Sequence, residues 1–263
     1  MIIKVLLPFL MFTTLFAVDE SLKENMEFKM EAGIFLPTLS GDISNTITNT
    51  NFADSLAFKN SSASYLSFES RLNYDYSPNF FISYFNIQDH SDTTLPEDIT
   101  LAGADYTAGI DITSTVDYDS VNIVAYQDFL LKGGSRALFG RYYPGDIEFD
   151  IGINVKYINW QYSIKDKTNL LRSDSWIKVY QFIPLPYFAF KYYRYNIMIN
   201  GDISAISIER AKVTSAQITF DYRLVKGVYA SMGYLYESFE VVEKSDTVVF
   251  NSSGTKLSFK YKF

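Results

Sequence analysis

The stretch Thr255-Lys-Leu-Ser-Phe-Lys-Tyr-Lys-Phe263 decides the fold of this chain. Apolar and polar residues alternate through it with a period of two, which is typical of a β-strand whose two faces meet different environments. Such a strand leaves an unpaired edge in a soluble protein, whereas it is fully paired when it closes a barrel with its apolar face towards lipid. The stretch therefore predicts a membrane-spanning β-barrel. The residues of its apolar face are Leu257, Phe259, Tyr261 and Phe263.

The first 17 residues have the composition of a secretory signal peptide. Lys4 supplies one positive charge, residues 5–16 form an apolar run, and Ala17 is a small residue suited to cleavage. The run is short and contains Pro8, so it does not cross the roughly 30 Å of hydrocarbon that a membrane anchor must span. We therefore expect residues 1–17 to be a signal peptide and residues 18–263 to form the mature barrel domain.

The composition agrees with a barrel and excludes several other classes. The chain has no cysteine, which excludes disulfides, thiolate metal sites and a cysteine nucleophile. Aromatic residues make up 17% of the chain, a proportion that interfacial girdles and a lipid-facing surface would use. The net charge of −7 argues against nucleic-acid binding. No phosphate-binding loop is recognisable, and we expect no cofactor.

Alternating segments recur along the chain, and ten can be counted. They predict an all-β fold, a transmembrane antiparallel up-and-down β-barrel of about ten strands, with eight and twelve as the alternatives left open. The segments cover residues 26–36, 63–75, 80–88, 112–129, 149–164, 176–190, 195–208, 213–224, 228–241 and 255–263.

The fourth and fifth segments change phase along their length. Apolar residues fall on odd positions over 121–129 and 149–157, and on even positions over 112–118 and 158–164. Pairing Phe129 with Phe149 would bring Ser120 opposite Ile158, so that both changes lie at one height. A change of phase indicates either a β-bulge or a strand that leaves the bilayer. Two changes at matching heights favour a strand that leaves the bilayer.

The connections between segments alternate roughly between long and short. We expect long outer loops at the polar stretches 38–62 and 89–111 and again after residue 241, and tight periplasmic turns at 76–79 and 225–227. The connection 132–146 is too long for this scheme. Pro184 and Pro186 cannot donate to a ladder, so we expect them to mark a bulge or the approach to a turn.

The chain resembles the small bacterial outer-membrane barrels of the OmpA/OmpW type, and a group of Gram-negative outer-membrane proteins with no agreed activity. The resemblance rests on residues 32–43 (AGIFLPTLSGDI), residues 149–157 (FDIGINVKY), residues 184–187 (PLPY) and the closing strand, which looks like a barrel sorting signal. It implies location in the outer membrane of a Gram-negative bacterium and contact with outer-membrane lipid. It also implies assembly by periplasmic chaperones and the barrel-assembly machinery, and we expect a monomer.

Charged residues of both signs fall on the face opposite the apolar one, which would line the lumen. Mixed charges favour a lumen plugged by internal pairing over a selective pore. We therefore expect an integral membrane protein with a mostly plugged lumen, extended outer loops and a structural or surface-interaction role. A narrow channel or small-ligand transport barrel is the alternative. The predicted lumen residues are Glu27, Lys29, Glu31, Glu69, Arg71, Asp150, Lys156, Asp221, Arg223, Lys256, Lys260 and Lys262.

The barrel would close between the first and last strands. If Phe263 lies at the periplasmic rim, the simplest antiparallel register places Lys262 beside Glu27 and Lys260 beside Lys29. Glu31 then lies beside Ser258.

Catalytic and metal-binding candidates are few. His90 is the only histidine, and with Asp89, Ser91 or Asp92 it could form a hydrolase site at the outer rim, a remote alternative with no nucleophile fixed by any motif. Acidic residues of the same loop lack the spacing of a calcium loop, which indicates a charged face. Those residues are Asp89, Asp92, Glu97, Asp98 and Asp105. We interpret Trp160 and Trp176 as interfacial anchors.

Overall fold

A computed structural model describes residues 26–44, 49–51, 61–72, 77–101, 104–131, 145–168, 175–209, 211–243 and 246–263. The expected signal peptide and nearly all of the long connection at 132–146 lie outside the described residues. Among the described residues, no helix is long and apolar enough to cross a membrane.

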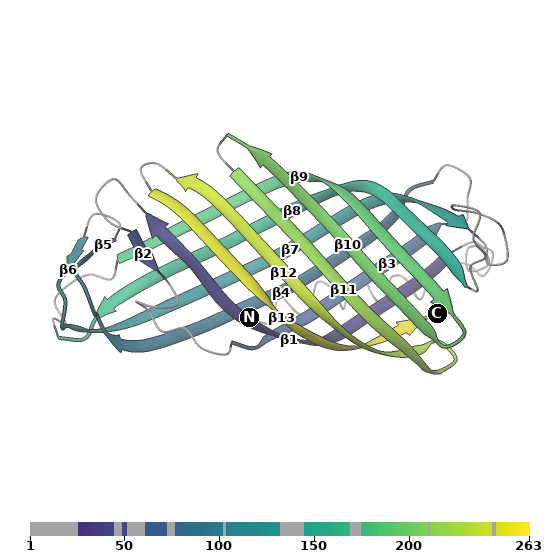
Figure 1. Cartoon of the computed structure of the whole chain (residues 1–263), viewed down its shortest axis with the longest axis horizontal. Coiled ribbons are helices and arrows are strands. Elements are labelled where there is room, and N and C mark those ends of the chain that lie inside the picture. The colour runs from purple at the N-terminus through teal and green to yellow at the C-terminus, as the bar shows by residue number, and fades with distance from the viewer. Residues whose placement is uncertain are drawn as a thin grey trace, which may run out of the picture.

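Ten long strands form one antiparallel sheet in which each strand pairs with the next along the chain (Figure 1). The last strand also pairs with the first, so the sheet closes into a barrel. The predicted ten-stranded barrel is confirmed. The strands are β1 (Met26–Ser44), β3 (Ala63–Leu72), β4 (Asn79–Thr94), β7 (Asp111–Leu131), β8 (Asp146–Asp166), β9 (Ser175–Arg194), β10 (Ile197–Ile208), β11 (Ala211–Val225), β12 (Val228–Glu243) and β13 (Asp246–Lys262).

Three short strands complete the described chain. The strand β2 (Asn49–Asn51) pairs with the end of β1. The strands β5 (Ile99–Leu101) and β6 (Ala104–Tyr106) form a small hairpin at one end of the barrel, on the left in Figure 1. The C-terminus lies at the other end.

The outer surface of the barrel is apolar over only part of its length. On β1, Ile34 and Leu36 are exposed and apolar, whereas the outward residues further along, such as Thr38, are polar. The apolar outward residues encircle the barrel at the end that holds the C-terminus, and we call them the apolar belt. One member from each strand in order is Ile34, Leu66, Phe80, Ile123, Ile153, Phe188, Ile203, Ile218, Met232 and Leu257.

The interior has the opposite pattern. Inside the apolar belt the buried side chains are mostly polar or charged, for example Glu31 and Asp221, and we call this part the charged half. Beyond the belt the interior is an apolar core, which we call the apolar half. The β5–β6 hairpin contributes Ile99 and Tyr106 to this core. Other members are Phe35, Phe85, Ile112, Tyr118, Trp160 and Phe250.

This reversal explains the phase change in β7 and β8. Their pairing is continuous from Ile112–Asp166 to Leu131–Ile147, with Phe129 opposite Phe149 and Ser120 opposite Ile158 as predicted. No bulge interrupts it. The even-numbered residues face inwards from Ile112 to Tyr126 on β7 and from Glu148 to Asp166 on β8, and the environment changes from polar to apolar.

The interpretation of Trp160 as an interfacial anchor is wrong. Its side chain is fully buried among Tyr162, Phe239 and Phe250 in the apolar half, because even-numbered positions of β8 face inwards. Trp176 is 59% exposed on the outer surface of β9.

Parts of several expected loops are strands. β1 continues to Ser44 and β4 continues to Thr94, so the first residues of the polar stretches at 38–62 and 89–111 extend the wall. β13 begins at Asp246, so most of the residues expected in the loop after 241 extend it as well. Their polar residues face outwards, while buried apolar residues such as Leu39 and Val248 face inwards. The short turn between β11 and β12 is confirmed, and Gly227 adopts a φ of 80° there.

The two prolines of β9 lie within the strand. The β8–β9 pairing passes through Pro184 and Pro186 without a register shift, so the expected bulge is wrong. The pairing of β9 with β10 extends only from Arg194–Ile197 to Tyr187–Ser204.

Candidate functional site

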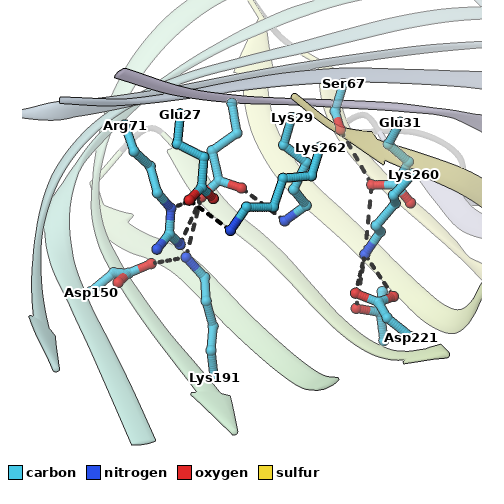
Figure 2. A network of polar contacts seen from close by, with 12 residues as sticks. Glu27, Lys29, Glu31, Ser67, Arg71, Asp150, Lys191, Asp221, Lys260 and Lys262 are labelled. Atoms are coloured by element: carbon cyan, nitrogen blue, oxygen red, sulfur yellow. Dashed lines mark hydrogen bonds and ion pairs between the residues drawn. The ribbon is translucent and has the colours of Figure 1, made fainter. Parts of the chain in front are cut away.

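The charged half of the lumen contains two groups of ionised side chains, which Figure 2 shows together on the inner side of the wall. The first group surrounds Lys191, which β9 directs into the barrel. Its ammonium lies 2.6 Å from Asp150, 3.0 Å from Glu148 and 3.3 Å from Glu69. All four side chains are at most 7% exposed. One buried cation therefore holds three carboxylates from two other strands.

Two further cations balance this Lys191 group. Arg71 lies 2.7 Å from Glu148 and 3.0 Å from Glu69, bridging β3 to β8 across the lumen. Lys29 of β1 lies 2.8 Å from Glu69. Buried charges are tolerated when they are paired and hydrogen-bonded, and three cations here meet three carboxylates.

The second group surrounds Lys260 and Lys256 on the inner face of β13. Lys260 lies 2.8 Å from Asp221 of β11 and 3.9 Å from Glu31 of β1. Lys256 lies 3.1 Å from Glu31 and 4.0 Å from the ring centre of Tyr65. This Lys260 group therefore connects β13 to β1 on one side and to β11 on the other.

A third buried pair lies next to the apolar half. Lys156 of β8 and Glu237 of β12 form an ion pair across the lumen, and both are almost fully buried. Glu237 also accepts hydrogen bonds from the Tyr118 hydroxyl at 3.1 Å and from the Ser215 hydroxyl at 2.7 Å. Lys156 donates to Ser120 at 3.0 Å.

The rim differs from the interior. Lys262 and Glu27 form an ion pair at 2.6 Å, but their side chains are 45% and 31% exposed. Arg223 is exposed near the end of β11, where its guanidinium donates to Asn196 at 2.6 Å. Its predicted place in the lumen is therefore wrong, because the strand has already reached the end of the barrel at this position.

The predicted register of the closing strands is displaced by two residues. Lys262 lies opposite Lys29, Lys260 opposite Glu31 and Ser258 opposite Gly33. Two predicted contacts exist nevertheless, because long side chains reach diagonally across the pair. They are Lys262 with Glu27, and the Ser258 hydroxyl, which donates to Glu31.

Sequence reasoning missed four charged residues of the lumen. Lys191 and Glu148 lie one residue beyond the expected ends of their segments, and their strands extend past them. Asp202 lies on a strand whose faces were not assigned, and Gln217 donates to it at 2.6 Å. Glu237 could have been found, because it alternates with the apolar residues Tyr234 and Tyr236.

Little space remains between these groups. Two cavities of about 20 Å³ each lie inside the charged half. Both are lined by Phe81, Tyr187, Asp202 and Gln217. Eight cations and eight carboxylates have been described in this interior and at its rim, so their formal charges cancel.

The outer-rim candidates do not form a compact site in the part of the chain that the structure describes. His90 is exposed on the outer face of β4 opposite Thr115, and the neighbouring Asp89 points to the other face. Asp92 instead contacts Lys167 at 2.8 Å. No three acidic or histidine side chains among the described residues are placed to hold a metal ion.

The remaining acidic candidates make local contacts. Asp98 accepts a hydrogen bond from the backbone of Ala108, and Asp105 accepts one from Thr100.

No protein-family model and no curated protein sequence matches the chain. Solved structures with some similarity include Neisserial surface protein A, at 11% identity and a TM-score of 0.35 over 90% of this chain and 97% of that one. Ail, the attachment invasion locus protein of Yersinia pestis, has 7% identity and a TM-score of 0.35 over 91% and 99%. The translocator domain of the autotransporter NalP from Neisseria meningitidis has 11% identity and a TM-score of 0.41 over 97% and 95%.

These similarities are too low to carry function. The closed ten-stranded sheet with its outer apolar belt is itself the architecture of an outer-membrane β-barrel.

Proposed function

We propose that the protein is an integral outer-membrane barrel with a plugged lumen, which acts as a scaffold for the surface that it presents beyond the membrane. The observation that carries this proposal is the pairing of lumen charges with one another across cavities of only about 20 Å³. A single water needs about 10–15 Å³, so such cavities suit isolated waters and exclude a column of solute.

The balance of charge supports the same proposal. Selective pores line a constriction with charges of one sign, or with a ring of carbonyl groups. Here the lysines around Glu31 and the carboxylates around Lys191 neutralise each other within their own groups. An ion entering the lumen would have to break these pairs.

The apolar half supplies a second barrier. The ring of Tyr118 lies 5.1 Å from that of Phe250 and 5.6 Å from that of Phe85. Leu95 and the β5–β6 hairpin pack into the same core. Apart from the exposed Trp176, the wall around this core is mostly polar on its outside, as expected of a barrel that projects into water beyond the bilayer.

Export and assembly complete the proposal. Residues 1–17 would direct export, periplasmic chaperones would carry the unfolded chain, and the barrel-assembly machinery would recognise the C-terminal strand. Leu257, Phe259 and Tyr261 are exposed on the outer face of this strand, and Phe263 follows it. Outer-membrane lipid would surround a monomer.

A narrow passage is the second candidate. The two interior cavities share four lining residues, among them Asp202 and Gln217, so they lie next to each other along the lumen. Small movements of these polar side chains would connect the two cavities.

Planar-bilayer recording of the refolded protein separates the two candidates. A plugged scaffold gives no steady unit conductance, whereas a passage gives reproducible unitary steps. Heat-modifiable gel migration must first show that the recorded sample is a folded barrel. Reproducible steps from such a sample would overturn the plugged-lumen proposal and leave the membrane barrel intact.

A further inference from the structure

The wall of the barrel is incomplete between β9 and β10. The β9–β10 pairing ends at Tyr187–Ser204, and no described residue pairs with residues 175–186 of β9 on that side. β10 turns back after Ile208, whereas β9 continues beside β8 along the apolar half. Figure 1 shows β10 ending and β11 beginning at the top of the view. We call the stretch beyond Tyr187–Ser204 the open seam.

The prolines lie on the free edge of this seam. Alternate residues of an antiparallel strand direct their backbone groups at opposite neighbours. Pro184 and Pro186 have no N–H to give, yet the β8–β9 ladder passes through both without a shift. Their backbones must therefore face away from β8, towards the open seam. The part of the seam next to Tyr187 thus presents the carbonyl groups of Pro184 and Pro186, and neither proline supplies a backbone N–H group there.

This part of the seam lies at the level of lipid. Pro184 and Pro186 are exposed on the outer surface beside Val155 and Ile153 of the apolar belt. An unpaired carbonyl in hydrocarbon is costly unless a partner supplies a hydrogen bond. Just above, Phe182 and Tyr180 have the aromatic character of a membrane–water interface.

A groove continues from the closed end of the seam. It has a volume of about 550 Å³ on the outer surface, and Phe188, Ile203 and Ile218 form apolar parts of its lining. Gly201 opens this groove, because a side chain there would project into free space, with no atom closer than 3.8 Å to its Cβ.

We propose that the open seam and this groove together bind one lipid of the surrounding bilayer. Its acyl chain lies over Gly201, and a hydroxyl or ammonium donor near its headgroup bonds the carbonyls of Pro184 and Pro186. Pro186 lies four residues from Phe190, the partner of Gly201, which is about 13 Å along a strand and within the reach of one lipid. The site takes lipids that carry hydrogen-bond donors.

A protein strand is a poorer occupant of the same seam. A strand from a second copy would need N–H groups from β9 to continue the ladder, and the two prolines remove them at the level of lipid. The proposed lipid donates hydrogen bonds, so it needs only the backbone carbonyl groups that the prolines keep. The lipid site extends the proposed scaffold function and rests on the barrel lying in a membrane.

Native mass spectrometry of the refolded full chain tests the site. After exchange from vesicles of phosphatidylglycerol, which carries hydroxyl donors, the protein is expected to retain one more lipid than Gly201→Leu. Ala125→Leu adds the same side chain to the lipid face of β7, outside the groove, and should retain as many lipids as the wild type. Equal retention by all three folded proteins would overturn the lipid site.

Two further comparisons separate the parts of the proposal. Vesicles of phosphatidylcholine, which has no donor, should leave the wild type without the extra lipid, and full retention would overturn the role of the proline carbonyls. A wild-type dimer that Gly201→Leu dissociates, without a change in lipid number, would assign the groove to a second copy instead. A sample that fails to show heat-modifiable migration would count against the membrane barrel itself.

Paired cysteines test whether the seam is open, and the chain has no native cysteine to interfere. Tyr187→Cys with Ser204→Cys joins the last paired positions and should oxidise readily. Leu185→Cys with Ile206→Cys occupies the next equivalent positions and should remain reduced, because a disulfide needs Cα atoms within about 7 Å. Equal disulfide formation, measured by alkylation and mass, would show that the seam is closed and would overturn the proposal.

Discussion

The ammonium of Lys262 lies 2.6 Å from the carboxylate of Glu27, although the residue opposite Lys262 in the β1–β13 ladder is Lys29. The ion pair is therefore diagonal, and it draws Lys262 away from a like charge. Lys29 turns instead to Glu69 on its other side, at 2.8 Å. Two lysines placed opposite each other are thus separated by the carboxylates of neighbouring strands.

Reversing one charge of this pair should weaken closure. Glu27→Lys places a third cation beside Lys29 and Lys262, and adding Lys262→Glu restores an attractive pair. Because both side chains are partly exposed, we expect a coupling of about 0.2–1 kcal/mol. Urea unfolding of the two single variants and the double variant measures it. A double variant no more stable than the sum of its single changes would contradict a contribution from this pair.

Removing Lys191 should destabilise the barrel far more. Lys191→Met leaves Asp150 without its cation and weakens the pairing of Glu148 and Glu69, and breaking a buried pair costs about 3–5 kcal/mol. Equilibrium unfolding in urea gives the loss.

The matched control for this change is Lys212→Met. Lys212 pairs with Glu240 at 2.8 Å on the outer surface, where both side chains are well exposed. Exposed pairs contribute about 0–1 kcal/mol, so this variant should remain close to wild type. Similar losses for both variants would show that the Lys191 group is not a stabilising centre.

Periodicity was sufficient to predict the ten strands but not their lengths. Phe129 lies opposite Phe149 as expected, because alternation and antiparallel pairing determine register between neighbours. The ends were missed where polar residues such as Thr38 face water on the outside of a continuing strand. Polarity on one face does not end a strand whose other face buries Leu39 in the apolar half.

The charged interior could be predicted only in part. The inward direction of Glu31 and Asp221 follows from alternation, whereas their partners depend on which strands lie across the lumen. Lys191 and Arg71 lie far apart in the sequence, yet both contact the same two carboxylates, Glu69 and Glu148. Alternation along one strand carries no information about such contacts.

A charged substitution in the apolar belt should destabilise the barrel. Phe220 faces outwards at belt level, and arginine at such a position costs about 2–4 kcal/mol. Thr214 also faces outwards on β11 but lies beyond the belt, so Thr214→Arg should cost only about 0–1 kcal/mol. Refolding titrations of the two variants compare them. Thr219 is unsuitable as a control, because it is buried next to Lys260.

The two tryptophans should report opposite environments. Trp176 is exposed on the outside of β9 and Trp160 is fully buried in the apolar half. Iodide, a quencher dissolved in water, should therefore quench the fluorescence of Trp160→Phe, in which Trp176 remains, more than that of Trp176→Phe. The reverse order would place Trp160 on the outer surface and contradict the apolar half as an internal core.

Phe263 combines two roles that an experiment can separate. Its backbone exchanges hydrogen bonds of 3.0 and 3.1 Å with Phe28, and its ring lies 5.6 Å from that of Phe28 and 5.5 Å from that of Tyr261. Deleting it removes two bonds of the closing pair, worth about 0.5–1.5 kcal/mol each, which a barrel of this size should tolerate. The deletion should therefore refold in detergent with only a modest loss of stability.

In cells the same deletion, or Tyr261→Asp with Phe263→Asp, should abolish insertion, because the assembly machinery would no longer recognise the strand. Heat-modifiable migration of membrane fractions measures insertion, and refolding in detergent is the control without machinery. Wild-type insertion in cells would contradict the sorting-signal hypothesis. Failure in both settings would mean that Phe263 acts through closure of the barrel, since loss of recognition alone leaves refolding in detergent unchanged.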